Sequence, residues 1–217
     1  QLLMTRGLTK EDAAVLSLYT IDYGNGFQES DNLYRKLDLA FNQRNALVLD
    51  QLKGITYLLL RAMRKLEPIQ VAELYRGSTT VIPLDKYRVG STITWHRIAS
   101  TTFDIEVTQG FMIKNKQTGV IGGTLFTLEN GWGYDVQPFS FFPEKEILLE
   151  PEVDFLVLSV DSSNSSTPST STPPTLVQAR LQMKESSLLL HKLLPSLVPN
   201  NASIITPPLV LMNSSLL

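Results

Sequence analysis

The spacing of apolar residues changes from helical to strand-like at Pro68, and this change constrains the fold more than any other feature of the chain. Before it, apolar residues such as Ile55 and Leu59 recur every three or four residues, the pattern of an amphipathic helix that the proline would end. After it, short apolar segments are separated by glycine, proline and asparagine, which predicts short strands. Because closely spaced strands favour antiparallel pairing, we expect an α+β fold, with a helical part over residues 1–70 and a β core over residues 71–160.

The individual elements follow from the same patterns. Thr9 and Asp12 stand where a capping box would begin the first helix, and a short helical segment is expected over Ile105–Met112. No GxGxxG sequence follows the first strand, so a Rossmann fold is not supported. The predicted strands are Val71–Tyr75, Ser91–Trp95, Ala99–Thr102, Thr124–Leu128, Glu146–Leu149 and Phe155–Val160.

The composition changes abruptly after Val160. Residues 161–174 read DSSNSSTPSTSTPP, a tract that has too little apolar surface to fold, and we interpret it as a linker. Residues 175–217 are then a tail, in which Thr175–Leu197 is expected to form an amphipathic helix and the proline-containing remainder to be irregular or disordered. The sequence therefore predicts one folded domain over residues 1–160.

Composition excludes several classes of function. With 43% hydrophobic and 18% charged residues, the chain has the make-up of a folded protein. A net charge of −2 without a Lys/Arg tract gives no reason to expect nucleic-acid binding, and no apolar stretch is long enough to span a membrane. The chain has no cysteine and two histidines, so disulfides, a thiol nucleophile and a histidine-rich metal site are not expected. The lack of cysteine fits a cytoplasmic or a secreted protein, and we expect a monomer.

A pair of carboxylates, Glu144 and Glu146, carries the clearest chemical signal. In an extended segment residues i and i+2 point to the same side, with Cα atoms about 6–7 Å apart, so both would face one pocket while Lys145 points away. One carboxylate can then stabilise a developing oxocarbenium ion while the other orients or deprotonates a nucleophile. The alternative is an exposed charged turn without a catalytic role. The aromatic residues that precede the pair favour the functional interpretation over this one.

Two further segments complete a possible site. Arg76 follows a predicted strand, and its planar guanidinium suits bidentate contact with phosphate oxygens, while Gly77 lets a ligand approach the backbone closely. Ser100-Thr101-Thr102 is a strand rich in hydroxyl groups. Taken singly, each has a structural explanation: an arginine paired with a surface acid, and a half-exposed strand that uses the strand propensity of threonine.

In this order the three segments resemble the arginine-specific mono-ADP-ribosyltransferases, the class defined by an Arg, a Ser-Thr-Ser-like strand and a Glu-x-Glu turn. The resemblance extends from about Leu18 to Val160, and Leu18-Tyr19-Thr20 and Leu33–Leu37 are similar to the helical half of that family. It implies a helical part packed on two small antiparallel sheets, with NAD in the cleft between them.

The resemblance also implies the role of each residue. Arg76 and Gly77 would hold NAD, and Ser100 would hydrogen-bond Glu146 and fix its rotamer. Glu146 would bind the ribose 2′-hydroxyl and stabilise positive charge at the anomeric carbon, and Glu144 would engage the acceptor arginine. The reaction would release nicotinamide and transfer ADP-ribose to an arginine-bearing protein without a metal.

The sequence departs from the family pattern at a few positions. Thr102 stands where serine is usual, Ile98-Ala99 where Phe-Thr or Phe-Ser is common, and Asp38 where asparagine is usual. Two alternatives therefore stay open: an NAD glycohydrolase, in which water is the acceptor, and a catalytically inactive relative that binds a nucleotide or a partner protein. A glycoside hydrolase would also use two carboxylates, but this chain is short and has few aromatic platforms for sugars.

Overall fold

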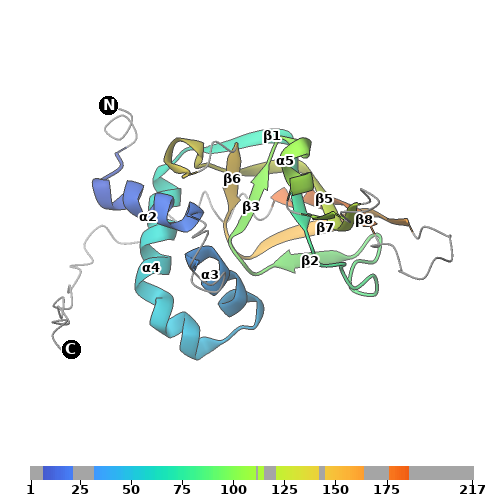
Figure 1. Cartoon of the computed structure of the whole chain (residues 1–217), viewed down its shortest axis with the longest axis horizontal. Helices are drawn as coiled ribbons and strands as arrows, with labels where there is room; N and C mark the ends of the chain where they lie inside the picture. The colour runs from blue at the N-terminus through green and yellow to red at the C-terminus, as the bar shows by residue number, and fades with distance from the viewer. Residues whose placement is uncertain are drawn as a thin grey trace.

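The computed structural model describes residues 7–21, 32–110, 112–114, 121–141, 145–163 and 176–185, and it confirms the α+β class (Figure 1). Its helices are α2 (Lys10–Thr20), α3 (Leu33–Asn42), α4 (Ala46–Lys65), α5 (Ile105–Gly110) and the 3₁₀ turn η2 (Gln137–Phe139). Its strands are β1 (Pro68–Ser78), β2 (Thr92–Trp95), β3 (Ala99–Thr102), β4 (Ile113–Lys114), β5 (Ile121–Asp135), β6 (Glu146–Leu149), β7 (Val153–Ser163) and β8 (Leu176–Met183).

The predicted capping box begins α2, and it also ties α2 to α4. The Thr9 hydroxyl accepts from the Asp12 amide at 3.2 Å, and the Asp12 carboxylate accepts from the Thr9 amide at 2.8 Å. Asp12 is fully buried and forms ion pairs with Arg61, at 2.8 Å, and with Lys65, both on α4. Burial alone would raise the pKa of Asp12, but hydrogen bonds from Lys65, the Thr9 amide and Arg61 outweigh it and hold the pKa well below its usual range.

The helical part lies on one side of the molecule and the strands on the other (Figure 1). Helix α4 ends at Lys65, shortly before the proline that was expected to end it, and buries Leu59, Ala62 and Met63. These side chains belong to one apolar cluster that continues through Leu74 of β1 to Leu148 of β6. The helices therefore rest directly on the strands that carry the predicted site.

The strands follow the order β1-β3-β6-β5-β8-β7-β2, and β4 pairs with β5. All six predicted strands are present: β3 and β6 have the predicted bounds, and β1, β5 and β7 are longer than predicted. In the described residues two antiparallel groups can be distinguished, one of β1, β3, β6 and β5 and one of β7 and β2. β8 lies between them, parallel to β5 and antiparallel to β7, so the two groups form one continuous sheet.

The helix predicted over Thr175–Leu197 is wrong in the part that the structure describes. Leu176–Met183 is the strand β8, and its burial alternates: Gln178 and Arg180 are exposed, while the residues on either side of each are buried or half-buried. This period of two is that of a strand with one face against a core. The edges of β5 and β7 supply main-chain hydrogen-bond partners on both sides, which a solvent-exposed helix would leave unpaired.

The predicted domain end at Val160 is also too early. β7 continues to Ser163, and the fold resumes with β8 after the Ser/Thr/Pro tract. Of the predicted linker, residues 164–174 lie outside the described residues, as do residues 186–217 of the tail.

If β8 is a central strand, Leu181→Ala should destabilise the fold strongly. Leu181 is fully buried between the partners of β8, and truncating a buried leucine costs about 2–5 kcal/mol through lost apolar contact and the cavity left behind. Urea unfolding followed by circular dichroism measures the change. Gln178→Ala, on the exposed face of the same strand, is the control and should change the free energy of unfolding by less than about 0.5 kcal/mol. Equal, small effects from both substitutions would contradict the placement of β8.

Candidate active site

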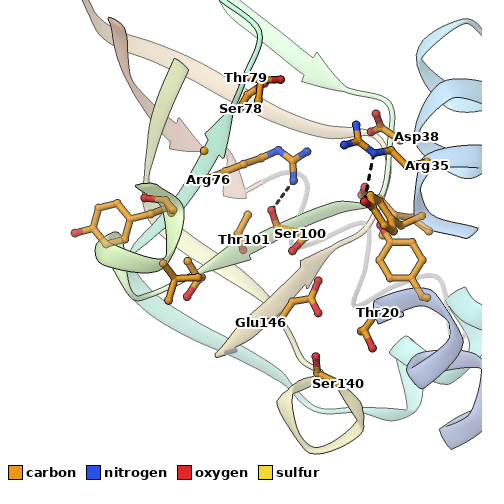
Figure 2. A pocket seen from close by; sticks show the side chains of 18 residues that line it. Thr20, Arg35, Asp38, Arg76, Ser78, Thr79, Ser100, Thr101, Ser140 and Glu146 are labelled. Atoms are coloured by element: carbon orange, nitrogen blue, oxygen red, sulfur yellow. Dashed lines mark hydrogen bonds between the residues drawn. The ribbon is translucent and has the colours of Figure 1, made fainter. Parts of the chain in front are cut away.

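A cavity of about 360 Å³ lies between the helical part and the sheet (Figure 2). Its volume is within the range of small-molecule sites. Its lining comes from α2, α3, β1, β3, α5 and β6, together with the segment before β6. The lining residues are Tyr19, Thr20, Tyr34, Arg35, Asp38, Tyr75, Arg76, Gly77, Ser78, Thr79, Ile98, Ser100, Thr101, Thr102, Val107, Thr108, Ser140 and Glu146.

Strand pairing brings three of the four predicted catalytic residues to this cavity, and Gly77, predicted to bind the cofactor, lines it as well. Tyr75 of β1 pairs with Thr102 of β3, and Thr102 pairs in turn with Glu146 of β6. Arg76, Ser100 and Glu146 therefore reach the cavity from three adjacent strands, although the chain separates them widely (Figure 2). Glu144, the fourth predicted residue, lies outside the described residues.

Arg76 is held by the main chain of β3. Its Nη1 donates to the Ser100 carbonyl oxygen at 2.6 Å, so this contact does not depend on the serine side chain. Burial lowers the pKa of Arg76 to about 10, and the neighbouring Arg97 guanidinium adds to the effect. The group still carries its charge at neutral pH, and its buried Nε has no hydrogen-bond partner among the described residues. Such a desolvated cation with an unused donor suits an anionic ligand.

Glu146 is 9% exposed and differs in its surroundings from two other buried carboxylates. Asp12 is paired with Arg61 and Lys65 away from the cavity. Glu150 accepts two hydrogen bonds of 3.0 Å from Arg64 and one of 2.8 Å from the Tyr134 hydroxyl. Glu146 instead faces the cavity, near enough to Arg76 and Tyr19 for its charge to act on both.

Tyr19 shows the low polarity of this part of the cavity. Burial, with the Glu146 carboxylate as the second cause, raises the pKa of Tyr19 well above its usual value. Its hydroxyl donates to the Ile98 carbonyl oxygen at 3.3 Å. Ile98 is itself buried and lines the cavity, so the residue that departs from the family pattern is part of the site.

In the hydroxyl-rich strand, the second and third side chains, Thr101 and Thr102, form hydrogen bonds that hold the local structure. The Thr101 hydroxyl donates to the Ile147 carbonyl oxygen at 2.8 Å and so links β3 to β6. The Thr102 hydroxyl accepts from the Asp104 amide at 3.1 Å, at the turn into α5. Ser100 is half-buried and lines the cavity, and its hydrogen bond to Glu146 stays a prediction.

Helix α2 holds the segment that leads to the carboxylate turn, a role that the sequence did not indicate. The Ser17 hydroxyl donates to the Phe139 carbonyl oxygen at 2.6 Å. The Thr20 hydroxyl accepts from the Phe141 amide at 3.0 Å. Both contacts fix main-chain atoms of Phe139 and Phe141, so the helical part holds the described segment that precedes β6 in the chain.

Helix α3 supplies a mixed pair of charges to the opposite wall, Arg35 and Asp38 (Figure 2). Asp38 accepts from Arg97 at 2.9 Å and from the Asn42 side chain at 3.2 Å, so both its oxygens are engaged. Arg35 donates to the Tyr34 hydroxyl at 3.3 Å and lies over the Tyr34 ring, 5.4 Å from its centroid. These residues lie in or next to the segment that is similar to the helical half of the family, but they were not predicted to be site residues.

Within the described parts of the chain, no three His, Cys, Asp or Glu side chains gather in a way that would hold a metal ion. None of the described helices is long and apolar enough to cross a membrane.

Comparison with known proteins identifies the family. Residues 2–168 match the model of the NAD:arginine ADP-ribosyltransferase family. The chain belongs to this family. It is accordingly an ADP-ribosyltransferase whose substrate is NAD. A search of curated proteins finds no match.

Solved structures of bacterial ADP-ribosyltransferases share the fold. Vis toxin from Vibrio splendidus superposes with a TM-score of 0.58 at 16% identity, over 82% of this chain and 75% of the toxin. HopU1 of Pseudomonas syringae gives 0.56 at 18% identity, over 80% and 76%. Exoenzyme S from Pseudomonas aeruginosa, bound to carba-NAD and human 14-3-3 protein beta, gives 0.56 at 22% identity, over 82% and 76%.

Gly77 has a structural requirement of its own. A Cβ at this position would lie 2.3 Å from the Thr108 carbonyl oxygen and 3.1 Å from Met112 Cγ. No L side chain fits against a main-chain atom at that distance, so glycine is what lets α5 pack against β1.

Gly77→Ala should therefore displace α5 and lower the free energy of unfolding by about 1–3 kcal/mol, as overpacking does. The matched control is Gly54→Ala, inside α4, where a Cβ would meet nothing within 4 Å. That substitution should stabilise the protein by about 0.5–1 kcal/mol because alanine favours a helix. Thermal unfolding of both variants gives the sign of each change in stability. A stabilised Gly77→Ala protein would contradict the packing described here.

Proposed function

We propose that the protein transfers ADP-ribose from NAD to the guanidinium group of an arginine side chain and releases nicotinamide. The observation that carries the proposal is the arrangement of Arg76 and Glu146, a half-buried cation and a buried carboxylate that face one cavity from β1 and β6, the two strands on either side of β3. A dinucleotide has an anionic pyrophosphate, which Arg76 would bind. It also has a ribose that becomes cationic in the reaction, and Glu146 would stabilise that charge. The family match supports NAD as the substrate, and the pattern Glu144-Lys145-Glu146 supports arginine as the acceptor.

In this mechanism Arg76 binds NAD through its phosphate oxygens and Gly77 through its backbone. Glu146 accepts a hydrogen bond from the ribose 2′-hydroxyl. As the bond between nicotinamide and the anomeric carbon breaks, its electrons leave with nicotinamide, and the Glu146 carboxylate stabilises the oxocarbenium ion. Ser100 positions this carboxylate.

The second half of the reaction belongs to Glu144. Its carboxylate binds the acceptor guanidinium and directs a nitrogen to the anomeric carbon from the side opposite to nicotinamide. The new carbon–nitrogen bond forms as the guanidinium loses one proton, and the anomeric centre inverts. Water in place of the guanidinium gives the NAD glycohydrolase reaction, so the acceptor decides between the two activities.

Glu146→Gln should abolish both nicotinamide release and transfer in a folded protein. An amide lacks the charge that stabilises the oxocarbenium ion, and the loss of one preorganised electrostatic group costs about 3–4 kcal/mol, or a factor of several hundred in kcat. Nicotinamide release from NAD is measured by chromatography, with thermal unfolding to verify the fold. Glu67→Gln, at an exposed position outside the cavity, is the control. Near-normal release by the Glu146 variant would remove it from the bond-breaking step.

Glu144→Gln should separate the two activities. An amide pairs poorly with a guanidinium, so modification of arginine should be lost while much of the NAD hydrolysis remains. The assay measures nicotinamide and ADP-ribosylated agmatine in the same reaction, for wild type and variant. A parallel fall in both products would place Glu144 in the bond-breaking step. A wild-type protein that hydrolyses NAD but never modifies agmatine would be a glycohydrolase.

A further inference from the structure

Three turns of the chain meet at His96, which lies between β2 and β3. Arg44, between α3 and α4, and Glu152, between β6 and β7, both contact this histidine. Both also have a left-handed backbone, with φ of 49° for Arg44 and 65° for Glu152. A residue other than glycine adopts that conformation at a cost in free energy. The fold therefore maintains two unfavourable backbone conformations whose side chains come together at one imidazole.

The hydrogen bonds of His96 determine where its proton lies. Arg44 Nη2 is 2.8 Å from Nε2 of the imidazole, and the Glu152 carboxylate oxygens are 2.9 and 3.0 Å from Nδ1. A guanidinium only donates hydrogen bonds and an ionised carboxylate only accepts them, so Nε2 is the acceptor and Nδ1 carries the proton. Among the described residues these are the charged groups in contact with His96, since the neighbouring Arg97 is directed to Asp38. The neutral imidazole thus joins Arg44 to Glu152.

A second link runs beside the first. Asp38 of α3 accepts from Arg97, the residue after His96, at 2.9 Å. Arg44 lies just beyond the C-terminal end of α3, so both links join this helix to consecutive residues of the segment between β2 and β3. Asp38 stands where asparagine is usual in the family, and an asparagine has no charge to pair with Arg97. The two links together fix how α3 lies against this segment.

These links connect opposite walls of the cavity. On one wall α3 presents Arg35 and Asp38, and on the other the chain that continues from Arg97 into β3 presents Ser100 (Figure 2). His96 itself does not line the cavity. Under the proposed function NAD binds between these walls, so their separation determines how well both of them contact it.

We propose that His96 is a positioning residue for NAD. In its neutral form it joins Arg44 to Glu152, and together with the ion pair between Asp38 and Arg97 it holds α3 at the distance from β3 that a dinucleotide fills. It touches no reacting atom, so its loss weakens NAD binding and leaves bond breaking unchanged. The inference rests on the proposed function in placing NAD in this cavity, but it does not depend on which acceptor is used.

Kinetics and binding of the same variants test the proposal, and calorimetry with carba-NAD measures binding without turnover. His96→Ala should raise KM for NAD and Kd for carba-NAD by about three- to ten-fold, as expected for one or two lost hydrogen bonds, and leave kcat for nicotinamide release within about two-fold of wild type. His96→Gln should restore binding, because its amide offers an acceptor to Arg44 and a donor to Glu152. Lys53→Ala breaks an exposed 2.9 Å ion pair with Asp50 on α4 and is the control, which should change none of these values.

The pH dependence of binding separates hydrogen bonding from packing. An imidazole takes up its second proton between about pH 8 and pH 5, and a protonated Nε2 cannot accept from Arg44. The contact is therefore present at the upper end of this range and lost toward the lower end, so the wild-type Kd for carba-NAD should rise as the pH falls. In His96→Gln, whose amide does not titrate, this rise should be absent.

Arg44→Gly removes the same link from its other end. Glycine adopts the left-handed backbone at no steric cost, which offsets the lost hydrogen bond, so thermal unfolding should stay close to that of wild type. The Kd for carba-NAD should nevertheless rise as it does in His96→Ala. This variant keeps the test open if His96→Ala fails to fold, because a merely structural contact would not weaken binding in an equally stable protein.

Unchanged carba-NAD binding in both His96→Ala and Arg44→Gly would overturn the proposal. So would a lower kcat at unchanged KM, which would place His96 in the bond-breaking step, or a His96→Gln protein that binds as weakly as His96→Ala. A wild-type protein that does not bind carba-NAD would refute the proposed NAD site, and this inference with it. Selective weakening of binding in a protein that never modifies arginine would support the positioning role and overturn only the proposed acceptor.

Discussion

The insertion of β8 between β5 and β7 is the interaction on which the sheet depends. Without it, the described strands would form two separate antiparallel groups, one of which carries the site and the other only β7 and β2. β8 pairs along β5 from Gly123 to Glu129, on the side of β5 opposite to β1. β5 in turn pairs with β1 and β6, which position Arg76 and Glu146. A strand from beyond the Ser/Thr/Pro tract, and beyond the residues that match the family model, thus supports the strands that line the cavity.

The helical part fixes main-chain segments that lead into the strands of the cavity. The Tyr19 hydroxyl bonds the Ile98 carbonyl just before β3, and Ser17 and Thr20 bond the segment before the carboxylate turn. Asp12 anchors the same helix to α4 through two cations. The same helix therefore contacts the main chain just before β3 and the segment that precedes β6.

The sequence predicted most of the fold because its core elements are local patterns. The capping box, the long helix ended by Pro68 and the bounds of β3 and β6 each depend on a few neighbouring residues. β8 was missed because its sequence fits two periods. Leu176, Ala179 and Met183 are spaced as on a helix, whereas alternate residues from Val177 to Met183 are spaced as on a strand. Only the open edges of β5 and β7, distant in sequence, decide between them, and a local pattern contains no information about such partners.

The cavity residues that belong to local motifs were predictable from the sequence, and those that depend on packing were not. Arg76, Ser100 and Glu146 stand in segments with recognisable order, whereas Arg35 and Asp38 reach the cavity only because of how α3 packs. Their arrangement explains what kind of ligand the cavity favours. Arg97 is neutralised by Asp38. Arg76 has the neutral Ser100 carbonyl as its hydrogen-bond acceptor among the described residues, and burial disfavours its charged form. An anionic group such as a pyrophosphate would supply the charged hydrogen-bond partner that this guanidinium lacks there, and a neutral ligand would not.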